Sequence, residues 1–215
     1  MKKVLKNVSF VFLLLKMCII LGQETATQKR IIIDVGHGGK DSGAIGINKI
    51  QEKDVVLDIA LEIFSLNKQS ETPLDIYLTR YSDTLISLTD RSKLSKALKA
   101  DVFISLHCNH SDNPNARGVE VYVANTTSKY SKKAAWLAFQ LQAAFRKQLG
   151  FESRGVKFAN FQVLRESVDY RPAVLVEAGF LTNEDEGRYF SQPSKIRTMS
   201  MAILKGIYNY SNTRL

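Results

Sequence analysis

Short runs rich in β-branched and aromatic residues alternate along this chain with longer segments of helical periodicity. That alternation predicts an α/β fold, in which crossover helices join the strands. We expect one mostly parallel, twisted sheet of about six strands, flanked by helices on both faces. The expected strands span residues 30–35, 74–80, 102–107, 118–124, 161–165 and 173–177, and the expected helices span residues 52–66, 90–100, 131–149 and 194–210.

The segment between residues 29 and 210 contains no internal repeat, low-complexity tract or Pro/Gly-rich linker. A chain of 215 residues, of which 45% are hydrophobic, is long enough to bury one sizeable core. The sequence therefore predicts a single domain over residues 30–215, preceded by a short polar leader at residues 23–29.

Residues 1–22 are typical of a secretory signal peptide, because lysines precede an apolar run that ends at the small residue Gly22. Cleavage is expected after Gly22 or Ala26. The alternative is a membrane anchor, but Lys16 interrupts the run, which is shorter than the roughly 20 residues of a spanning helix. We therefore expect an exported protein, periplasmic or extracellular, with no stable membrane insertion after cleavage.

The chain is basic, with a formal net charge of +9 that falls to +5 when residues 1–22, with four lysines and no acidic residue, are removed. A basic excess favours polyanionic partners. Zinc-finger, RRM-like and P-loop spacings are absent, and the lysines are not gathered with aromatic residues into a stripe. Nucleic acid is therefore not an expected partner.

The sequence has two cysteines, Cys18 in the predicted signal peptide and Cys108 in the domain, so no internal disulfide is expected after cleavage. Cys108 follows His107, and adjacent residues of a strand point to opposite faces. We therefore interpret Cys108 as a small buried hydrophobic residue rather than as a metal ligand.

Three of the expected strands end at or next to polar residues that could bind a ligand or transfer a proton. His37 follows the first strand, His107 ends the third and Glu177 ends the last. Ligands bind at the carboxyl ends of strands in an open α/β sheet, so these side chains are expected to converge on one cleft. Each histidine alone is as consistent with a hydrogen-bonded structural group as with a ligand. Glycines at positions 36, 38 and 39 free the backbone around His37, which favours a functional role there.

Glu52 begins the first expected helix. At helical spacing it falls on the same stripe as Val56 and Ile59, whereas Asp54 and Asp58 fall on the opposite arc. Glu52 is therefore expected to point inward, although a first-turn glutamate stabilised by the helix dipole in solvent is the alternative. Because a buried carboxylate is costly unless it is paired with a cation or bound to a metal, the inward position favours a metal ligand.

Two histidines and one carboxylate form a frequent ligand set for catalytic zinc, with a fourth position left for water. We therefore predict one Zn²⁺ per chain, held by His37, Glu52 and His107. Glu177 is the expected general base, because the apolar run before it would partly desolvate its carboxylate, which suits proton transfer. The alternative for Glu177 is an edge glutamate paired with a lysine.

Together these segments resemble the zinc-dependent N-acetylmuramoyl-L-alanine amidases of the amidase 3 family over nearly all of residues 30–210. The resemblance is carried by the runs DVGHGGKDSGA from Asp34, EKD from Glu52, LTR from Leu78, SLHCN from Ser105 and VEAGF from Val176. The chain departs from the family at Val35, where proline is usual, and at Cys108, where alanine is usual. Neither residue is a predicted ligand.

The resemblance implies hydrolysis of the amide bond between N-acetylmuramic acid and L-alanine of peptidoglycan, in cell-wall remodelling and daughter-cell separation. It assigns zinc binding to His37, Glu52 and His107, and catalysis to Glu177. Peptidoglycan, with its glycan strand and stem peptide, is then the expected partner of a monomeric enzyme. The basic surface would attract the carboxylates of the stem peptides.

Four further residues receive less direct assignments. Asp34 and Ser105 are expected near the two histidines, where they either orient the imidazoles through hydrogen bonds or cap the strand ends. Asn109 and Arg165 are expected to meet the glycan or the stem peptide, since arginine pairs well with carboxylates.

Two alternative functions remain at the level of sequence. A zinc deacetylase or carboxypeptidase acting on the same polymer would need the same metal, water and glutamate. A non-catalytic peptidoglycan-binding protein could use an amidase fold, although all four candidate groups are present here. A Ser-His-Asp hydrolase is set aside because the chain has no G-x-S-x-G elbow.

Some members of the amidase 3 family carry an extra helix after the fourth strand, which blocks the zinc until a partner protein removes it. The short link between residues 124 and 131 predicts that this chain has no such helix. We therefore expect the purified protein to digest isolated sacculi without an added activator. Digestion that begins only after a candidate activator is added would contradict this expectation.

Overall fold

The apolar runs of the sequence form a six-stranded sheet in the computed structural model, which describes residues 28–213. In the order along the sheet β2-β1-β3-β6-β4-β5, the strands are β2 (Asp75–Leu78), β1 (Arg30–Val35), β3 (Val102–Asn109), β6 (Ala173–Phe180), β4 (Val119–Ala124) and β5 (Ser153–Ala159). The isoleucines of β1 are fully buried, as expected for a central strand covered on both faces. The predicted signal peptide and nearly all of the polar leader lie outside the described residues.

The sheet is mixed, although most of its strand pairs are parallel as predicted. β2, β1, β3 and β6 run in one direction, whereas β4 is antiparallel to β6 and parallel to β5. Because β4 runs against β6, its first residues lie at the edge where β1, β3 and β6 end. Glu120 of β4 is thereby paired with Glu177 of β6, which is paired on its other side with His107 of β3.

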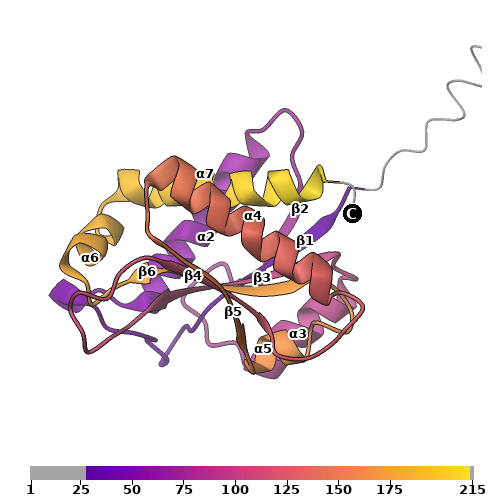
Figure 1. Cartoon of the computed structure of the whole chain (residues 1–215), viewed down its shortest axis with the longest axis horizontal. Coiled ribbons are helices and arrows are strands. Elements are labelled where there is room, and N and C mark those ends of the chain that lie inside the picture. The colour runs from indigo at the N-terminus through magenta and orange to yellow at the C-terminus, as the bar shows by residue number, and fades with distance from the viewer. Residues whose placement is uncertain (1–27, 214–215) are drawn as a thin grey trace, which may run out of the picture.

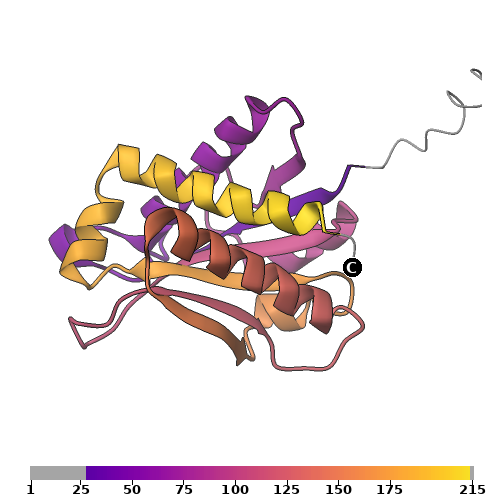
Figure 2. The ribbon, with the colours of Figure 1, turned by 45° about the horizontal axis from the view of Figure 1, so that its top comes forward.

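Helices cover both faces of the sheet, which confirms the predicted layers (Figure 1). Three long helices, α2 (Glu52–Lys68), α4 (Ser131–Leu149) and α7 (Pro193–Ser211), pack on one face over the larger hydrophobic core. Two short helices, α3 (Leu88–Ala97) and α5 (Gln162–Arg165), lie on the other side, and the view in Figure 2 shows the same separation. The remaining short elements are η1 (Ile47–Lys49) and α6 (Glu184–Phe190).

The face with the short helices is covered only in part. Its smaller core contains Ile32, Phe103 and Leu175, which lie in the amino-terminal parts of β1, β3 and β6. Since every second residue of a strand shares a face, His107 and Glu177 lie on this same face, beyond the apolar layer. The fold therefore leaves the carboxyl end of this face free for polar side chains.

The structure differs from the prediction in two regions, one where a predicted strand is a helix and one where a helix was not predicted. The strand predicted at residues 161–165 is wrong, because residues 162–165 form α5 and the fifth strand is β5. The sequence of β5, SRGVKFA, carries two cations and a glycine, so it lacks the apolar signal of an inner strand, whereas residues 161–165, FQVLR, contain three large apolar side chains. Helix α6 was not predicted, although Asn183 caps it by accepting from the backbone N–H groups of Asp185 and Glu186.

Residues 125–130 connect β4 to α4 without an intervening helix, as the short link predicted. Within residues 28–213, no helix combines the length and the hydropathy needed to span a bilayer.

Candidate functional site

His37 lies in a glycine-rich turn after β1 and has a backbone φ of 56°, a left-handed conformation that a non-glycine residue adopts only when its surroundings hold it. Two buried arginines stabilise this backbone conformation. Arg80 donates from Nη2 to the carbonyl oxygen of Gly36 (2.8 Å), and Arg91 donates from Nη2 to that of His37 (2.7 Å). The backbone around His37 is therefore fixed by charge-assisted hydrogen bonds.

Glycines allow the three predicted ligands to come together. A Cβ at Gly36 would lie 2.5 Å from Cε1 of His107, and one at Gly43 would lie 2.5 Å from Oε2 of Glu52. Neither distance is tolerated by real Cβ atoms, so a larger residue at either position would displace a side chain of the cluster.

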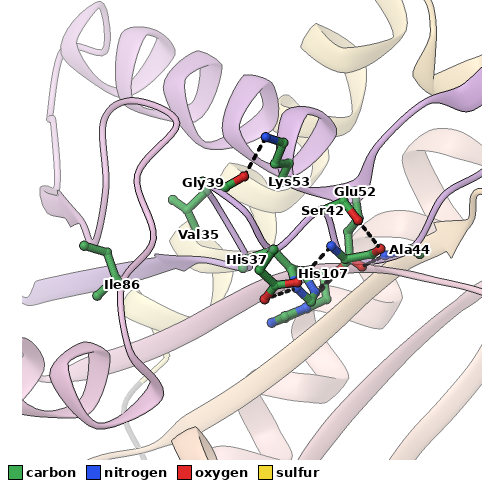
Figure 3. Close-up of polar contacts among 12 residues, drawn as sticks. Val35, His37, Gly39, Ser42, Ala44, Glu52, Lys53, Ile86 and His107 are labelled. Carbon is green, nitrogen blue, oxygen red and sulfur yellow. Dashed lines mark hydrogen bonds and ion pairs between the residues drawn. The ribbon is translucent and has the colours of Figure 1, made fainter.

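Glu52 is the first residue of α2 and only 4% exposed, which confirms that it points inward. Its Oε1 lies 2.8 Å from Nδ1 of His107 and 3.1 Å from Nε2 of His37. Its Oε2 accepts a hydrogen bond from the backbone N–H of Ala44 (2.8 Å), and Oε1 also accepts from that of Cys108 (3.0 Å). Figure 3 shows the two imidazoles gathered beside this carboxylate.

The predicted ligand set meets in space. One donor atom from each of His37, Glu52 and His107 lies within 4.8 Å of the others. The two imidazole rings are 5.0 Å apart and nearly perpendicular, with an interplanar angle of 83°. Two imidazole nitrogens and one carboxylate oxygen are the donors that a catalytic zinc site uses, so these residues fit that ion.

Opposite charges bind the cluster together. Burial opposes protonation of His37, but the Glu52 and Asp41 carboxylates outweigh it and raise its pKa to about 9. Burial likewise opposes ionisation of Glu52, but hydrogen bonds from the two histidines hold the pKa of Glu52 well below its usual range. The carboxylate is therefore ionised at neutral pH, as a metal ligand must be.

Asp41 is a site residue that the sequence analysis did not assign. Its Oδ2 lies 2.9 Å from Nδ1 of His37, on the side of the ring away from Glu52. A carboxylate behind an imidazole fixes the tautomer and leaves Nε2 free to ligate. The available signal was an acidic residue four positions after His37 in the same turn.

Asp34 and Ser105 lie deeper in the sheet than the imidazoles and bond to each other, with Ser105 Oγ donating to Asp34 Oδ2 (2.6 Å). Asp34 Oδ1 also accepts from Thr79 Oγ1 (2.9 Å) and from Arg91 Nη1 (2.8 Å). Within residues 28–213, neither side chain hydrogen-bonds to an imidazole. Their connection to the site runs through Arg91, which also contacts the His37 backbone.

Glu177 lies beside the ligand cluster, directly opposite His107 in the pairing of β3 and β6. Neighbouring strands lie about 4.8 Å apart, so the two side chains are neighbours on one face. Burial raises the pKa of Glu177 to about 7, and its Oε2 is buried without a hydrogen-bond partner among the described residues. A carboxyl group that titrates near neutrality is suited to accepting and returning a proton.

The remaining candidates are Asn109, which lies near Glu177, and Arg165, which lies away from the cluster; Cys108 is buried. Asn109 donates from Nδ2 to Glu120 Oε2 (3.1 Å), next to Glu177 in the sheet. Arg165 instead donates from Nη1 to Oδ1 of Asn160 (2.6 Å), and the structure does not bring it into contact with the cluster. Cys108 is 2% exposed, which confirms its interpretation as a buried residue, and burial raises the pKa of its thiol.

Replacing Arg91 with lysine tests how strongly the His37 backbone is held. Lysine keeps the positive charge beside Asp34 but has a single nitrogen, so it cannot replace both Nη1, which contacts Asp34 and the Val35 carbonyl, and Nη2, which contacts the His37 carbonyl. We expect Arg91→Lys to lower the free energy of unfolding by about 2 kcal/mol in urea denaturation. Arg146→Lys, at an exposed position of α4, is the control and should cost less than about 0.5 kcal/mol. Equal effects of the two substitutions would contradict this account.

Comparisons with known proteins identify the family of this chain. A family model described as N-acetylmuramoyl-L-alanine amidase matches residues 31–209. The N-acetylmuramoyl-L-alanine amidase LytC of Bacillus subtilis (strain 168) is 38% identical over 181 residues, which cover 84% of this chain but 35% of LytC. The endolysin of Bacillus phage SPP1 is 36% identical over 188 residues, which cover 86% of this chain and 67% of the endolysin. This chain thus spans about a third of the length of LytC.

Solved structures give the same result. An N-acetylmuramoyl-L-alanine amidase from Clostridium difficile 630 has a TM-score of 0.80 and 31% identity, covering 88% of this chain and 100% of that one. The catalytic domain of CwlV, an N-acetylmuramoyl-L-alanine amidase from Bacillus(Paenibacillus) polymyxa, has a TM-score of 0.77 and 35% identity, covering 86% and 99% of the two chains. The resemblance noted in the sequence is confirmed, and this chain belongs to the N-acetylmuramoyl-L-alanine amidase family, amidase 3.

Proposed function

We propose that this protein is a zinc-dependent amidase that hydrolyses the bond between N-acetylmuramic acid and L-alanine in peptidoglycan. The observation that carries the proposal is the meeting of His37, Glu52 and His107 within 4.8 Å of one another, with Glu177 beside them. Membership of the amidase family supports the substrate. The donor chemistry of the three ligands supports the metal.

Each residue then has a distinct task. His37, Glu52 and His107 would hold the zinc ion, and Asp41, at Nδ1 of His37, would leave Nε2 of that ring available to bind it. When bound, zinc would polarise the scissile carbonyl and make water a stronger nucleophile at neutral pH. Glu177 accepts the proton of the attacking water and delivers it to the nitrogen of the departing L-alanine.

The proposed place of action is the cell wall, outside the cytoplasm. Two observations support it, namely the signal-like segment at residues 1–22 and the description of similar proteins from Staphylococcus epidermidis as probable cell wall amidases. Cell-wall remodelling, including daughter-cell separation, is the process that we propose for a monomeric enzyme. The positive net charge of the protein would attract the carboxylates of the stem peptides and so favour the first encounter with peptidoglycan.

The reaction itself is tested by the products formed from purified sacculi. We expect the protein lacking residues 1–22 to bind one zinc ion and to release peptides with a new L-alanine amino terminus, leaving the glycan intact. Chelation should abolish release, and added zinc should restore it. Released acetate would instead indicate a deacetylase, and released D-alanine a carboxypeptidase.

Glu177→Gln separates metal binding from proton transfer. Glutamine keeps the size of the side chain but cannot accept the proton, so we expect activity to fall by about 10²–10⁴-fold with zinc content unchanged. Glu71→Gln, at an exposed position after α2, is the matched control and should keep full activity. Full activity of Glu177→Gln would contradict the assigned role. Zinc-loaded wild type without any activity would favour a non-catalytic peptidoglycan-binding protein.

A further inference from the structure

A second polar cluster lies next to Glu177 and is centred on Glu120. This carboxylate is only 3% exposed and is directly opposite Glu177 in the pairing of β4 and β6. Its Oε1 accepts from Arg154 Nε and from Lys157 Nζ, each at 2.6 Å. Its Oε2 accepts from Tyr122 Oη at 2.6 Å and from the Asn109 amide at 3.1 Å.

The cluster carries more positive charge than its carboxylate needs. Burial opposes ionisation of Glu120, but its hydrogen bonds from Lys157, Tyr122 and Arg154 lower its pKa, so one negative charge faces two positive ones. One cation would suffice to pair a buried carboxylate. The second cation leaves the group of Glu120, Arg154 and Lys157 with one positive charge in excess, next to Glu177.

Both cations retain hydrogen-bonding capacity towards solvent. The side chains of Arg154 and Lys157 are 35% and 37% exposed, whereas that of Glu120 is 4% exposed. Lys157 Nζ carries three N–H groups and donates to Glu120 alone among the described residues. Arg154 donates from Nε and, at 3.3 Å, from Nη1 to the Arg117 carbonyl, which leaves Nη2 without a described acceptor.

The surroundings hold these side chains in place. The guanidinium carbon of Arg154 lies 5.2 Å from the ring centroid of Phe180, a cation–π contact that directs the side chain back over β6. Lys157 is paired with Tyr122 across β4 and β5, and the Tyr122 ring packs edge-on against Phe161 at 5.3 Å. Contacts with Phe180 and Tyr122 therefore restrict the positions of the two cationic side chains.

Their distance from the reacting group suits a peptide substrate. Neighbouring strands lie about 4.8 Å apart, so β5 is roughly 10 Å from Glu177 of β6, and its long side chains extend part of the way back. An extended peptide advances about 3.3–3.6 Å per residue, so a group one to three residues from the scissile amide would reach Arg154 and Lys157.

We propose that Arg154 and Lys157 form a subsite for a free carboxylate on the second residue of the stem peptide, which lies within the reach of one to three residues from the scissile amide. This inference rests on the proposed amidase function and names the part of the substrate that the cations recognise. The N-acetylated sugars bear no carboxylate once the lactyl group is in the scissile amide, so the anion comes from the peptide. Glu120 sets the direction of both cations without contacting the substrate.

The test compares two soluble muropeptides that differ only in the second stem residue, which carries either a free carboxylate or the carboxamide. We expect wild type to cleave the carboxylate form with a kcat/KM about tenfold higher, chiefly through a lower KM, as one charge-assisted hydrogen bond would give. Arg154→Gln and Lys157→Gln should each lower kcat/KM for the carboxylate form more than for the carboxamide form, and so reduce this preference towards unity.

Each variant leaves one cation on Glu120, so the buried carboxylate stays paired and the fold is retained. Lys205→Gln, at an exposed position of α7 on the opposite face, is the control and should keep the wild-type preference. Equal cleavage of the two muropeptides by wild type would overturn the subsite, and so would a preference that both variants retain. Wild type that cleaves neither muropeptide nor sacculi would instead refute the amidase function on which the subsite rests.

Discussion

The structure around the site depends on one buried carboxylate, that of Glu52. It begins a helix, where the backbone dipole favours negative charge, and two other segments of the chain reach it. The turn after β1 contributes His37 and the Ala44 N–H, and the end of β3 contributes His107 and the Cys108 N–H. Burying a carboxylate costs several kcal/mol unless its oxygens are satisfied, and here the contacts with His37 and His107 both offset that cost and bring the predicted ligands together.

The same region explains why the fold buries two arginines. A left-handed histidine is strained, and Arg80 and Arg91 compensate by binding the carbonyl oxygens of its turn. Asp34 forms a buried ion pair with Arg91, whereas Arg80 donates to carbonyl oxygens. On the face that carries α3 and α5, these short helices leave the carboxyl end of the sheet uncovered, and Glu177 lies at that end next to His107. Long helices on one face and short helices on the other thus determine where the candidate site lies.

The sequence predicted the parts of this arrangement that follow from periodicity and composition. The buried strands around His107 have continuous apolar runs, and Glu52 falls on the apolar stripe of its helix, so both were predicted correctly. β5 was missed because an edge strand with Arg154 and Lys157 has no such run, and the cluster on Glu120 was missed with it. Asp41 was missed because its role depends on a turn that brings it back to its own histidine, and turn geometry leaves little trace in hydrophobic pattern.

The central claim is that His37, Glu52 and His107 share a single metal ion. X-ray absorption at the zinc edge of the zinc-loaded protein tests it most directly, because it reports the atoms bound to the metal. The account predicts only nitrogen and oxygen neighbours at about 2.0–2.1 Å, with the outer-shell scattering of two imidazoles. A sulfur neighbour at about 2.3 Å would place Cys108 on the metal, and fewer than two imidazoles would remove a histidine from it. Either result would contradict the site described here.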